Sequence, residues 1–255
     1  MTTTPEARTG WLDFDTYLRM IRADSERLAE VGRLGLDQAV PSCPGWTVGD
    51  LLDHVAHVYL HKVAWLRRGS RPDPWPPPEL KGREPAGLFD EATEALLAEL
   101  ESRDPDAAAE TFWEPDQTVG FWYRRMALEA AVHRYDGELA HGVPTSIEDD
   151  LAVDGIDEAL RVMLGGPWWT QFDTEEPLDA RVRVTSGGRS WTVTADLRSV
   201  SVVEGDTEEV PTEIAGRPED TYLWMWGRRE ADVLAITGDQ ALAEGFRRRL
   251  AETMG

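Results

Sequence analysis

The sequence predicts an α+β protein in two parts, a bundle of four helices over residues 1–145 and a small mixed α/β domain over residues 146–255. Two observations support this. In the first part, apolar residues recur with the 3.6-residue period of a helix, whereas after residue 180 they alternate with the two-residue period of a strand. The change follows "HGVPTS", where the last long helical pattern ends. Helices followed by strands are typical of an α+β fold.

The first two predicted helices have clear limits. Residues 14–34 carry apolar residues at near-helical spacing. After the turn-rich "VPSCPGW", Thr47 begins a second helix with Asp50 three residues later, as in a capping box, and Gly69 ends it. The proline-rich segment "GSRPDPWPPPELKGREP" cannot be regular structure. We expect a long loop there that packs over the body through Trp75.

The remaining elements follow in order. A third helix is predicted over residues 87–102 and a fourth over about 116–141, which completes an antiparallel bundle. A further helix is expected at about 148–164. In "ARVRVTSGGRSWTVTADL" two alternating runs flank Gly187-Gly188, which indicates a hairpin. Its turn consists either of the two glycines or of the longer segment "SGGRS". "SVSVVEG", "PTEIAGR" and "VLAITGD" read as strands, and "PEDTYLWMWGRRE" and "QALAEGFRRRLAETM" as helices.

Composition limits the possible partners. The chain has 255 residues and a net charge of -22, so binding to nucleic acid or to an anionic membrane is not expected. Its single cysteine, Cys43, excludes an internal disulfide and suits a reducing cytoplasm. No signal peptide or membrane-spanning run is evident. Lys62 and Lys81 are the only lysines, and this bias towards arginine suggests a bacterial genome rich in GC.

The most informative stretch is "LEAAVHRYDGELA" in the fourth predicted helix. Glu129, His133 and Asp136 share one helical face, and Trp122 and Met126 extend that face towards the start of the helix. The aromatic and the methionine indicate that the face is inside the protein. A buried carboxylate and imidazole are costly unless they pair or bind a metal.

The second predicted helix supplies a further ligand candidate. It carries three histidines, of which His54 lies at the edge of the apolar stripe and His57 and His61 turn further towards solvent. His54 with Glu129 and His133 forms a set that suits zinc or another divalent transition metal with an open position. Asp136 either holds an imidazole in its ligating tautomer or ligates directly. The alternatives are a solvated Glu–His pair, and a histidine stripe that is a solvated flank or an adventitious metal site.

Three stretches resemble the mycothiol-dependent maleylpyruvate isomerase family. "VPSCPGWTVGDLLDHVAHVYLHKVAWLRRG" resembles its N-terminal region, "FWYRRMALEAAVHRYDGELA" its metal-binding helix, and "DTYLWMWGRREADVLAITGD" its C-terminal domain. Together they cover nearly the whole chain in the right order, and their combination is quite specific.

The resemblance implies a DinB-like four-helix bundle with a His/Glu/His metal site and a sterol-carrier-like C-terminal domain. By motif position, the ligands map onto His54, Glu129 and His133. The metal is zinc in the founding activity, while nickel, iron or manganese occur in DinB-like relatives. One departure is Leu128, where many relatives carry histidine. It lies about 100° from Glu129 on the helix and should not be a primary ligand.

By resemblance, the protein is an actinobacterial, cytoplasmic metalloenzyme, an isomerase or S-transferase that activates a low-molecular-weight thiol, mycothiol. A divalent cation lowers the pKa of a bound thiol, so a thiolate exists near neutral pH. The thiolate adds to an electron-poor double bond, and rotation followed by expulsion of the thiol completes a cis–trans isomerisation. Stopping after addition or displacement makes the enzyme an S-transferase.

The expected partners are this thiol and a small electrophilic substrate, with or without a carboxylate group, and the protein is expected to be a monomer or dimer. Arg125 at the rim of the site and Arg228 in the C-terminal domain are candidates for binding a carboxylate, although surface ion pairs are the simpler reading of both. Cys43 is interpreted as a packed, inert thiol rather than a nucleophile. The alternative functions are a thiol-independent zinc hydrolase and a non-catalytic, metal-stabilised binding module.

Overall fold

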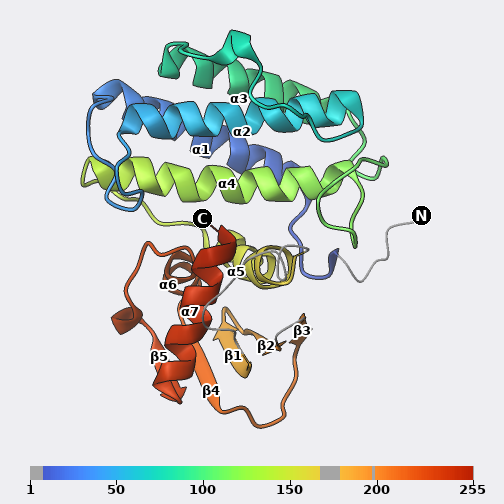
Figure 1. The fold of residues 1–255 in the computed structure, drawn as a ribbon, viewed down its shortest axis with the longest axis vertical. Helices are drawn as coiled ribbons and strands as arrows, with labels where there is room; N and C mark the ends of the chain where they lie inside the picture. Colours follow the sequence, from blue (N-terminus) through green and yellow to red (C-terminus); the bar gives the residue numbers. More distant parts are fainter. Residues whose placement is uncertain (1–7, 167–178, 197–198, 255) are drawn as a thin grey trace. The chain divides into compact units, whose positions relative to one another are not determined.

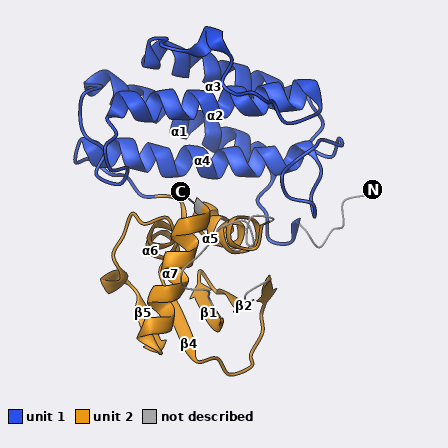
Figure 2. Ribbon diagram, in the orientation of Figure 1, with its two compact units in different colours: residues 1–146 blue, residues 147–255 orange. Residues whose placement is uncertain are grey.

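The structure is a computed structural model that describes residues 8–166, 179–196 and 199–254. The chain divides into two compact units, residues 1–146 and residues 147–255 (Figures 1 and 2). The first unit is helical and the second combines helices with a sheet, which confirms the predicted α+β class. None of the described helices combines the length and the apolar character that crossing a membrane would require.

Four long helices make the first unit, as Figure 1 illustrates. They are α1 (Phe14–Leu34), α2 (Val48–Arg68), α3 (Pro85–Glu101) and α4 (Val119–Ala140). Helix α1 packs mainly against α4, and α2 mainly against α3. Helix α4 is the most enclosed, because nearly all of its residues are buried, including the charged ones. A polar side chain on α4 therefore has to find its partner inside the bundle.

Local interactions explain where these helices begin. Thr47 and Asp50 form the predicted capping box at the start of α2, and Gly69 ends that helix in a left-handed conformation. Helix α3 begins slightly earlier than predicted because the Glu84 side chain accepts hydrogen bonds from the first backbone amides. Helix α4 begins later than predicted because Asp116 is held in the preceding loop by Arg8 and the Thr118 hydroxyl.

A buried ionic network joins α4 to α1. Both carboxylate oxygens of Glu138 are engaged, one with Arg27 at 2.7 Å and the other with Arg134 at 2.8 Å. Arg134 also contacts Asp24 of α1 at 3.0 Å, and the backbone amide of Thr145 donates to Glu138 at 2.8 Å. Each buried charge is thus paired, as a low-dielectric interior requires.

The proline-rich segment between α2 and α3 is a loop with a single helical turn, η2 (Pro78–Leu80). The peptide bonds that precede Pro74 and Pro76 are cis. The indole of Trp75 packs edge-on against the imidazole of His61, with ring centroids 5.0 Å apart. The loop therefore covers one side of α2, as expected for Trp75, and it leaves His61 half-buried rather than turned to solvent.

The second unit is built around a five-stranded sheet in the order β3-β2-β1-β4-β5. Strand β1 pairs in parallel with β4, and the other pairings are antiparallel. The strands are β1 (Ala180–Ser186), β2 (Arg189–Ala195), β3 (Val200–Glu204), β4 (Thr212–Gly216) and β5 (Ala235–Gly238). The β1–β2 hairpin has the short, two-residue turn, because Gly187 and Gly188 both adopt positive φ.

Three helices complete this unit: α5 (Asp149–Glu158), α6 (Pro218–Met225) and α7 (Gln240–Met254). Helix α5 continues into a π-helical turn, η3 (Ala159–Leu164), so the predicted single helix over 148–164 changes its hydrogen-bonding pattern partway. Helix α6 is shorter than predicted, because the chain turns at Gly227 with a φ of 77°. A short helical turn, η4 (Ala231–Val233), then leads into β5.

Candidate metal centre

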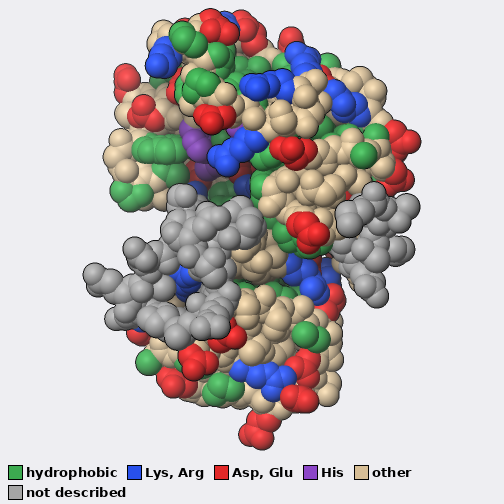
Figure 3. Space-filling view, turned by 45° about the vertical axis from the view of Figure 1, so that its right-hand side comes forward, with side chains coloured by type: hydrophobic (Ala, Val, Ile, Leu, Met, Phe, Trp, Pro, Cys, Tyr) green, Lys and Arg blue, Asp and Glu red, His purple; other side chains and the backbone are tan. Residues whose placement is uncertain are grey.

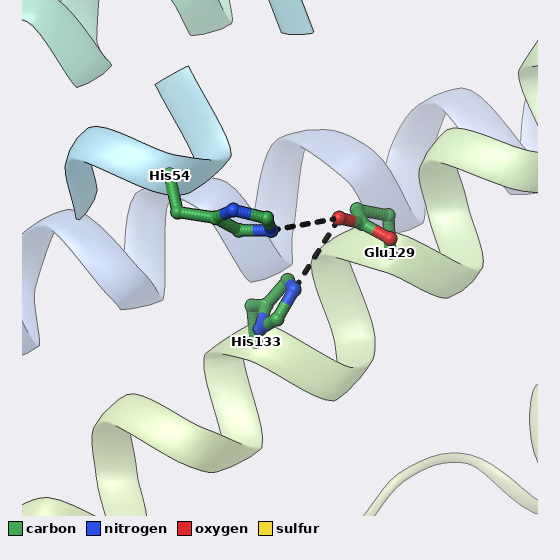
Figure 4. Close-up of side chains that lie close together, drawn as sticks. All are labelled: His54, Glu129 and His133. Atoms are coloured by element: carbon green, nitrogen blue, oxygen red, sulfur yellow. Dashed lines mark ion pairs between the residues drawn. The ribbon is translucent and has the colours of Figure 1, made fainter. Parts of the chain in front are cut away.

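Three side chains from two helices converge in the helical unit (Figure 4). His54 comes from α2, and Glu129 and His133 come from α4. Glu129 Oε1 lies 3.7 Å from His54 Nε2 and 3.3 Å from His133 Nε2. Among the residues that the structure describes, these three form the group of histidine and acidic side chains whose ligand atoms all lie within 4.8 Å of one another.

The donor set fits a divalent transition metal. Two imidazole nitrogens and one carboxylate oxygen are ligands that zinc and related metals accept. In a tetrahedral site with bonds of about 2.1 Å, neighbouring ligand atoms lie about 3.4 Å apart. The two distances to Glu129 are close to that spacing, so small side-chain movements suffice to close the set.

Glu129 is held by a buried cation on its far side. Its Oε2 accepts a hydrogen bond from Arg125, which lies one turn earlier on α4. Burial raises the pKa of Glu129, but the charges of Arg125 and His133 outweigh burial and hold that pKa well below its ordinary value. The carboxylate is therefore ionised and keeps Oε1 turned towards the two imidazoles.

His133 is oriented from behind by Asp136. The two groups meet at 3.0 Å, between His133 Nδ1 and Asp136 Oδ2. Asp136 is fully buried and also accepts a hydrogen bond from Ser42 Oγ at 2.6 Å, while Cys43 Sγ lies 3.7 Å from it. Burial lowers the pKa of His133, yet the neighbouring Glu129 and Asp136 carboxylates overcome this and raise it to about 9. A metal that binds here must displace a proton from this ring.

His54 forms the open side of the cluster. Its side chain is 38% exposed and packs against Trp46, with ring centroids 4.9 Å apart. It lines a cavity of about 600 Å³ whose other walls come from the start of α2 and from the proline-rich loop. The lining includes Trp46, His57, Trp75 and Lys81. Figure 3 shows histidine side chains in a recess of the helical unit, with basic side chains beside them.

The structure distributes the other predicted residues as follows. Arg125 is buried and pairs with Glu129, rather than lying at the rim. Arg228 belongs to the second unit, where its Nη1 donates to the Trp226 carbonyl at 2.5 Å, so its contact with substrate stays a prediction. Leu128 is fully buried and is not among the three clustered side chains. Cys43 is partly buried beside Asp136.

Sequence reasoning did not identify every contributor to this site. Ser42 and Trp46 reach it from the connector before α2, whose irregular backbone carries no periodic signal. The orienting role of Arg125 was also missed, although its spacing of four residues before Glu129 is that of a helical ion pair. The sequence assigns no role to Lys62, because the aromatic rings around its ammonium group come from two different helices.

A helical bundle that carries a partly buried His/Glu/His cluster, together with a separate α+β unit, defines a two-unit protein with a candidate metal centre. Family models extend this description. The model described as "Mycothiol maleylpyruvate isomerase N-terminal domain" matches residues 18–137, and the one described as "MDMPI C-terminal domain" matches residues 150–245. The chain therefore belongs to the mycothiol-dependent maleylpyruvate isomerase family, as the resemblance implied.

Solved structures agree with the fold. A crystal structure of the mycothiol-dependent maleylpyruvate isomerase is 13% identical and has a TM-score of 0.59, and the match covers 89% of this chain and 95% of that one. A histidine-to-alanine mutant of that enzyme matches at 13% identity with a TM-score of 0.58 and the same coverage. At this identity the likeness shows the fold alone. A search of curated proteins found no significant match.

Proposed function

We propose that the protein is a metal-dependent isomerase or S-transferase that uses a low-molecular-weight thiol of the mycothiol type on a small electrophilic substrate. The observation that carries this proposal is the convergence of His54, Glu129 and His133 in a member of this family. The similar solved enzyme is described as mycothiol-dependent and as acting on maleylpyruvate, which supports the choice of thiol and of substrate class. Zinc is the proposed metal.

Each of the three side chains would contribute one ligand atom to the metal. Glu129 would offer Oε1, with Arg125 fixing its other oxygen. His133 would offer Nε2, because Asp136 accepts the proton of Nδ1 and selects that tautomer. His54 would complete the set from the facing helix. A bound divalent metal supplies Lewis acidity that lowers the pKa of a thiol, so that the thiolate is available near neutral pH.

The cavity beside His54 could accommodate the thiol and the electrophilic substrate. Its volume of about 600 Å³ lies within the range typical of small-molecule sites. Trp46 and Trp75 supply apolar walls, and Lys81 supplies a positive charge in a lining that also contains Asp50 and Asp53. A carboxylated electrophile that enters on this side meets both the aromatic walls and the open face of the cluster. The single cysteine and the use of a free thiol suit a reducing compartment such as the cytoplasm.

The first test is metal content per chain, measured by mass spectrometry on protein purified without added metal or chelator. We expect close to one divalent ion per chain, lost in Glu129→Gln and retained in the neighbouring control His57→Ala. His57 lies one turn from His54 but is not in the cluster. A wild-type protein that contains no metal and is not stabilised by added zinc contradicts the proposal.

The second test is turnover of maleylpyruvate by the metal-loaded protein, with and without mycothiol. Isomerisation or thiol transfer that requires mycothiol supports the proposal. Metal-dependent hydrolysis that proceeds without thiol would replace it with a zinc hydrolase. Ligand binding without turnover in either condition would replace it with a metal-stabilised binding module.

A further inference from the structure

Lys62 has surroundings that are unusual for a lysine. The chain contains 24 arginines and only two lysines. Lys62 lies on α2, and its ammonium group sits over two tryptophan rings, 5.6 Å from the centroid of Trp65 and 5.2 Å from that of Trp122. Aromatic faces attract a cation but do not neutralise its charge. Such a lysine is held in place and remains able to bind an anion.

The position of Lys62 relates it to the candidate metal centre. The imidazole of His54 packs against that of His133, and Lys62 packs against Trp122, so α2 and α4 run antiparallel along this face. Lys62 lies about 12 Å from His54 along α2, and Trp122 lies about 10 Å from Glu129 along α4 in the same direction. The charges of Glu129 and Arg125 both act on Lys62, which places its ammonium within electrostatic range of the centre.

Within the described residues, the burial of the ammonium group is not balanced by a direct ion pair. Among the described parts of the chain, no carboxylate forms an ion pair with Lys62, although the chain carries 48 acidic residues. Its hydrogen-bond partner is His61 Nδ1, at 3.1 Å. Burial lowers the pKa of His61 to about 4, helped by the charges of Lys62 and Arg71, so this imidazole is neutral and accepts the bond. Burial likewise lowers the pKa of Lys62 to about 8.

The two rings that hold Lys62 are themselves fixed by Glu110. The indole of Trp65 donates to Glu110 Oε1 at 3.0 Å, and the indole of Trp122 donates to the Glu110 carbonyl at 3.3 Å. The same carboxylate oxygen accepts the backbone amide of Arg71 at 3.0 Å, so it is committed to these contacts rather than to Lys62. The aromatic surroundings of Lys62 are therefore preorganised, which is typical of a binding site rather than of a surface lysine.

We propose that Lys62 binds a carboxylate group of the substrate, at the far end of a molecule whose reacting part lies beside His54, Glu129 and His133. This inference rests on the proposed function, because it assumes that the cluster is the reactive centre. The ammonium would donate its remaining hydrogens to a carboxylate oxygen, and the faces of Trp65 and Trp122 would exclude water from the contact. The lysine would thus select anionic over uncharged substrates.

A purely structural role predicts a different response to mutation. If Lys62 mainly stabilised the packing of the two tryptophans, Lys62→Met would destabilise the fold. If Lys62 instead serves to bind an anion, its buried charge costs stability in the free protein. Lys62→Met then removes this cost and raises the Tm. Arg68→Met is the matched control, because Arg68 is an exposed cation on the same helix and its removal changes the net charge equally.

The test uses succinate, an unreactive small dicarboxylate, with succinamide as the uncharged control. The full-length protein, both metal-loaded and metal-free, is treated with an amine-acetylating ester, and modification of Lys62 is followed by mass spectrometry. We expect succinate at about 10 mM to slow acetylation of Lys62, with no effect of succinamide. We also expect Lys62→Met to weaken succinate binding by about 10-fold or more in calorimetry, and Arg68→Met to leave it within about twofold.

Two results would overturn the inference. One is equal acetylation of Lys62 with and without succinate, and the other is unchanged succinate binding in Lys62→Met. Because the metal-free protein is included and binding is the readout, these results do not depend on thiol chemistry. If turnover requires mycothiol but anion binding does not depend on Lys62, the proposed function stands and this inference is wrong. If anion binding depends on Lys62 but no mycothiol-dependent turnover is found, the anion site stands and the proposed function is wrong.

Discussion

Asp136 accepts the Nδ1 proton of His133 at 3.0 Å, on the side of the imidazole opposite to the His54–Glu129–His133 cluster. The contact leaves Nε2 as the nitrogen that faces Glu129 Oε1. Asp136 is itself fully buried and is anchored by Ser42, so it cannot turn away. The arrangement orients one of the proposed ligands and raises its basicity, as outer carboxylates do in many metal sites.

Replacing this carboxylate with an amide tests its role directly. We expect Asp136→Asn to weaken zinc affinity by about 10- to 100-fold, because the amide no longer favours the Nε2 lone pair of His133. Competition with a chromogenic chelator measures the change. Ser42→Ala, which removes one hydrogen bond to Asp136 and leaves its charge, should have a smaller effect. Equal zinc affinity in Asp136→Asn and wild type would show that Asp136 does not support a metal ligand.

The Glu138 network predicts a large loss of stability from a single substitution. Glu138→Ala removes a buried carboxylate that pairs with both Arg134 and Arg27, and it leaves the buried Arg134 with Asp24 as its remaining acidic partner. We therefore expect a loss of about 3 kcal/mol in the free energy of unfolding. Urea titration followed by circular dichroism measures it. Glu30→Ala is the control, because Glu30 also pairs with Arg27 but is exposed, and its loss should change stability by less than about 0.5 kcal/mol.

The Glu138 carboxylate should also make the free energy of unfolding depend on pH in the acid range. Burial raises the pKa of Glu138, but hydrogen bonds from Arg27, Thr145 and Arg134 outweigh burial and lower it. A carboxyl group whose pKa is lower in the folded state stabilises the protein above its unfolded pKa, and this contribution is lost as pH falls through the folded pKa. The difference in stability between wild type and Glu138→Ala should therefore shrink on acidification. A constant difference from pH 7 into the acid range contradicts this reasoning.

Lys62 predicts a second pH dependence, in the alkaline range. Its pKa is lowered to about 8 by burial and by Arg125 and Arg71, against the attraction of Glu129, whereas an unfolded lysine titrates near 10.4. Between these values the unfolded chain binds more protons than the folded one, so the stability of the wild type rises with pH. The advantage expected for Lys62→Met should be greatest below pH 8 and decline towards pH 10.4. Paired denaturation series measure this, and an advantage that grows with pH would be inconsistent with a buried ammonium.

The approach of α1 to α4 depends on Gly137. A Cβ atom at this position would lie 2.6 Å from Leu28 Cδ1, and Leu28 is almost fully buried. We expect Gly137→Ala to destabilise the protein by about 1 to 3 kcal/mol through overpacking. A double-mutant cycle with Leu28→Ala checks the cause, because the smaller side chain makes room for the methyl group. Strictly additive effects would exclude this contact as the source of the loss.

The fold class and most elements can be read from the sequence, because they depend on local chemistry. The span of α1, the capping box at Thr47 and the end of α2 at Gly69 follow from apolar spacing and from residues with strong backbone preferences. The Gly187-Gly188 turn follows for the same reason. Helical spacing also groups Glu129 with His133 and Asp136, since all three lie on one helix.

Only the tertiary structure decides which groups meet across elements. It brings His54 of α2 to the pair on α4, assigns Arg125 to Glu129, and covers His61 with Trp75. It also encloses Lys62 between rings from two helices. The physical reason is that helical periodicity specifies which side of a helix is buried, whereas the partner on that side depends on the packing and register of separate helices, which is a property of the whole bundle.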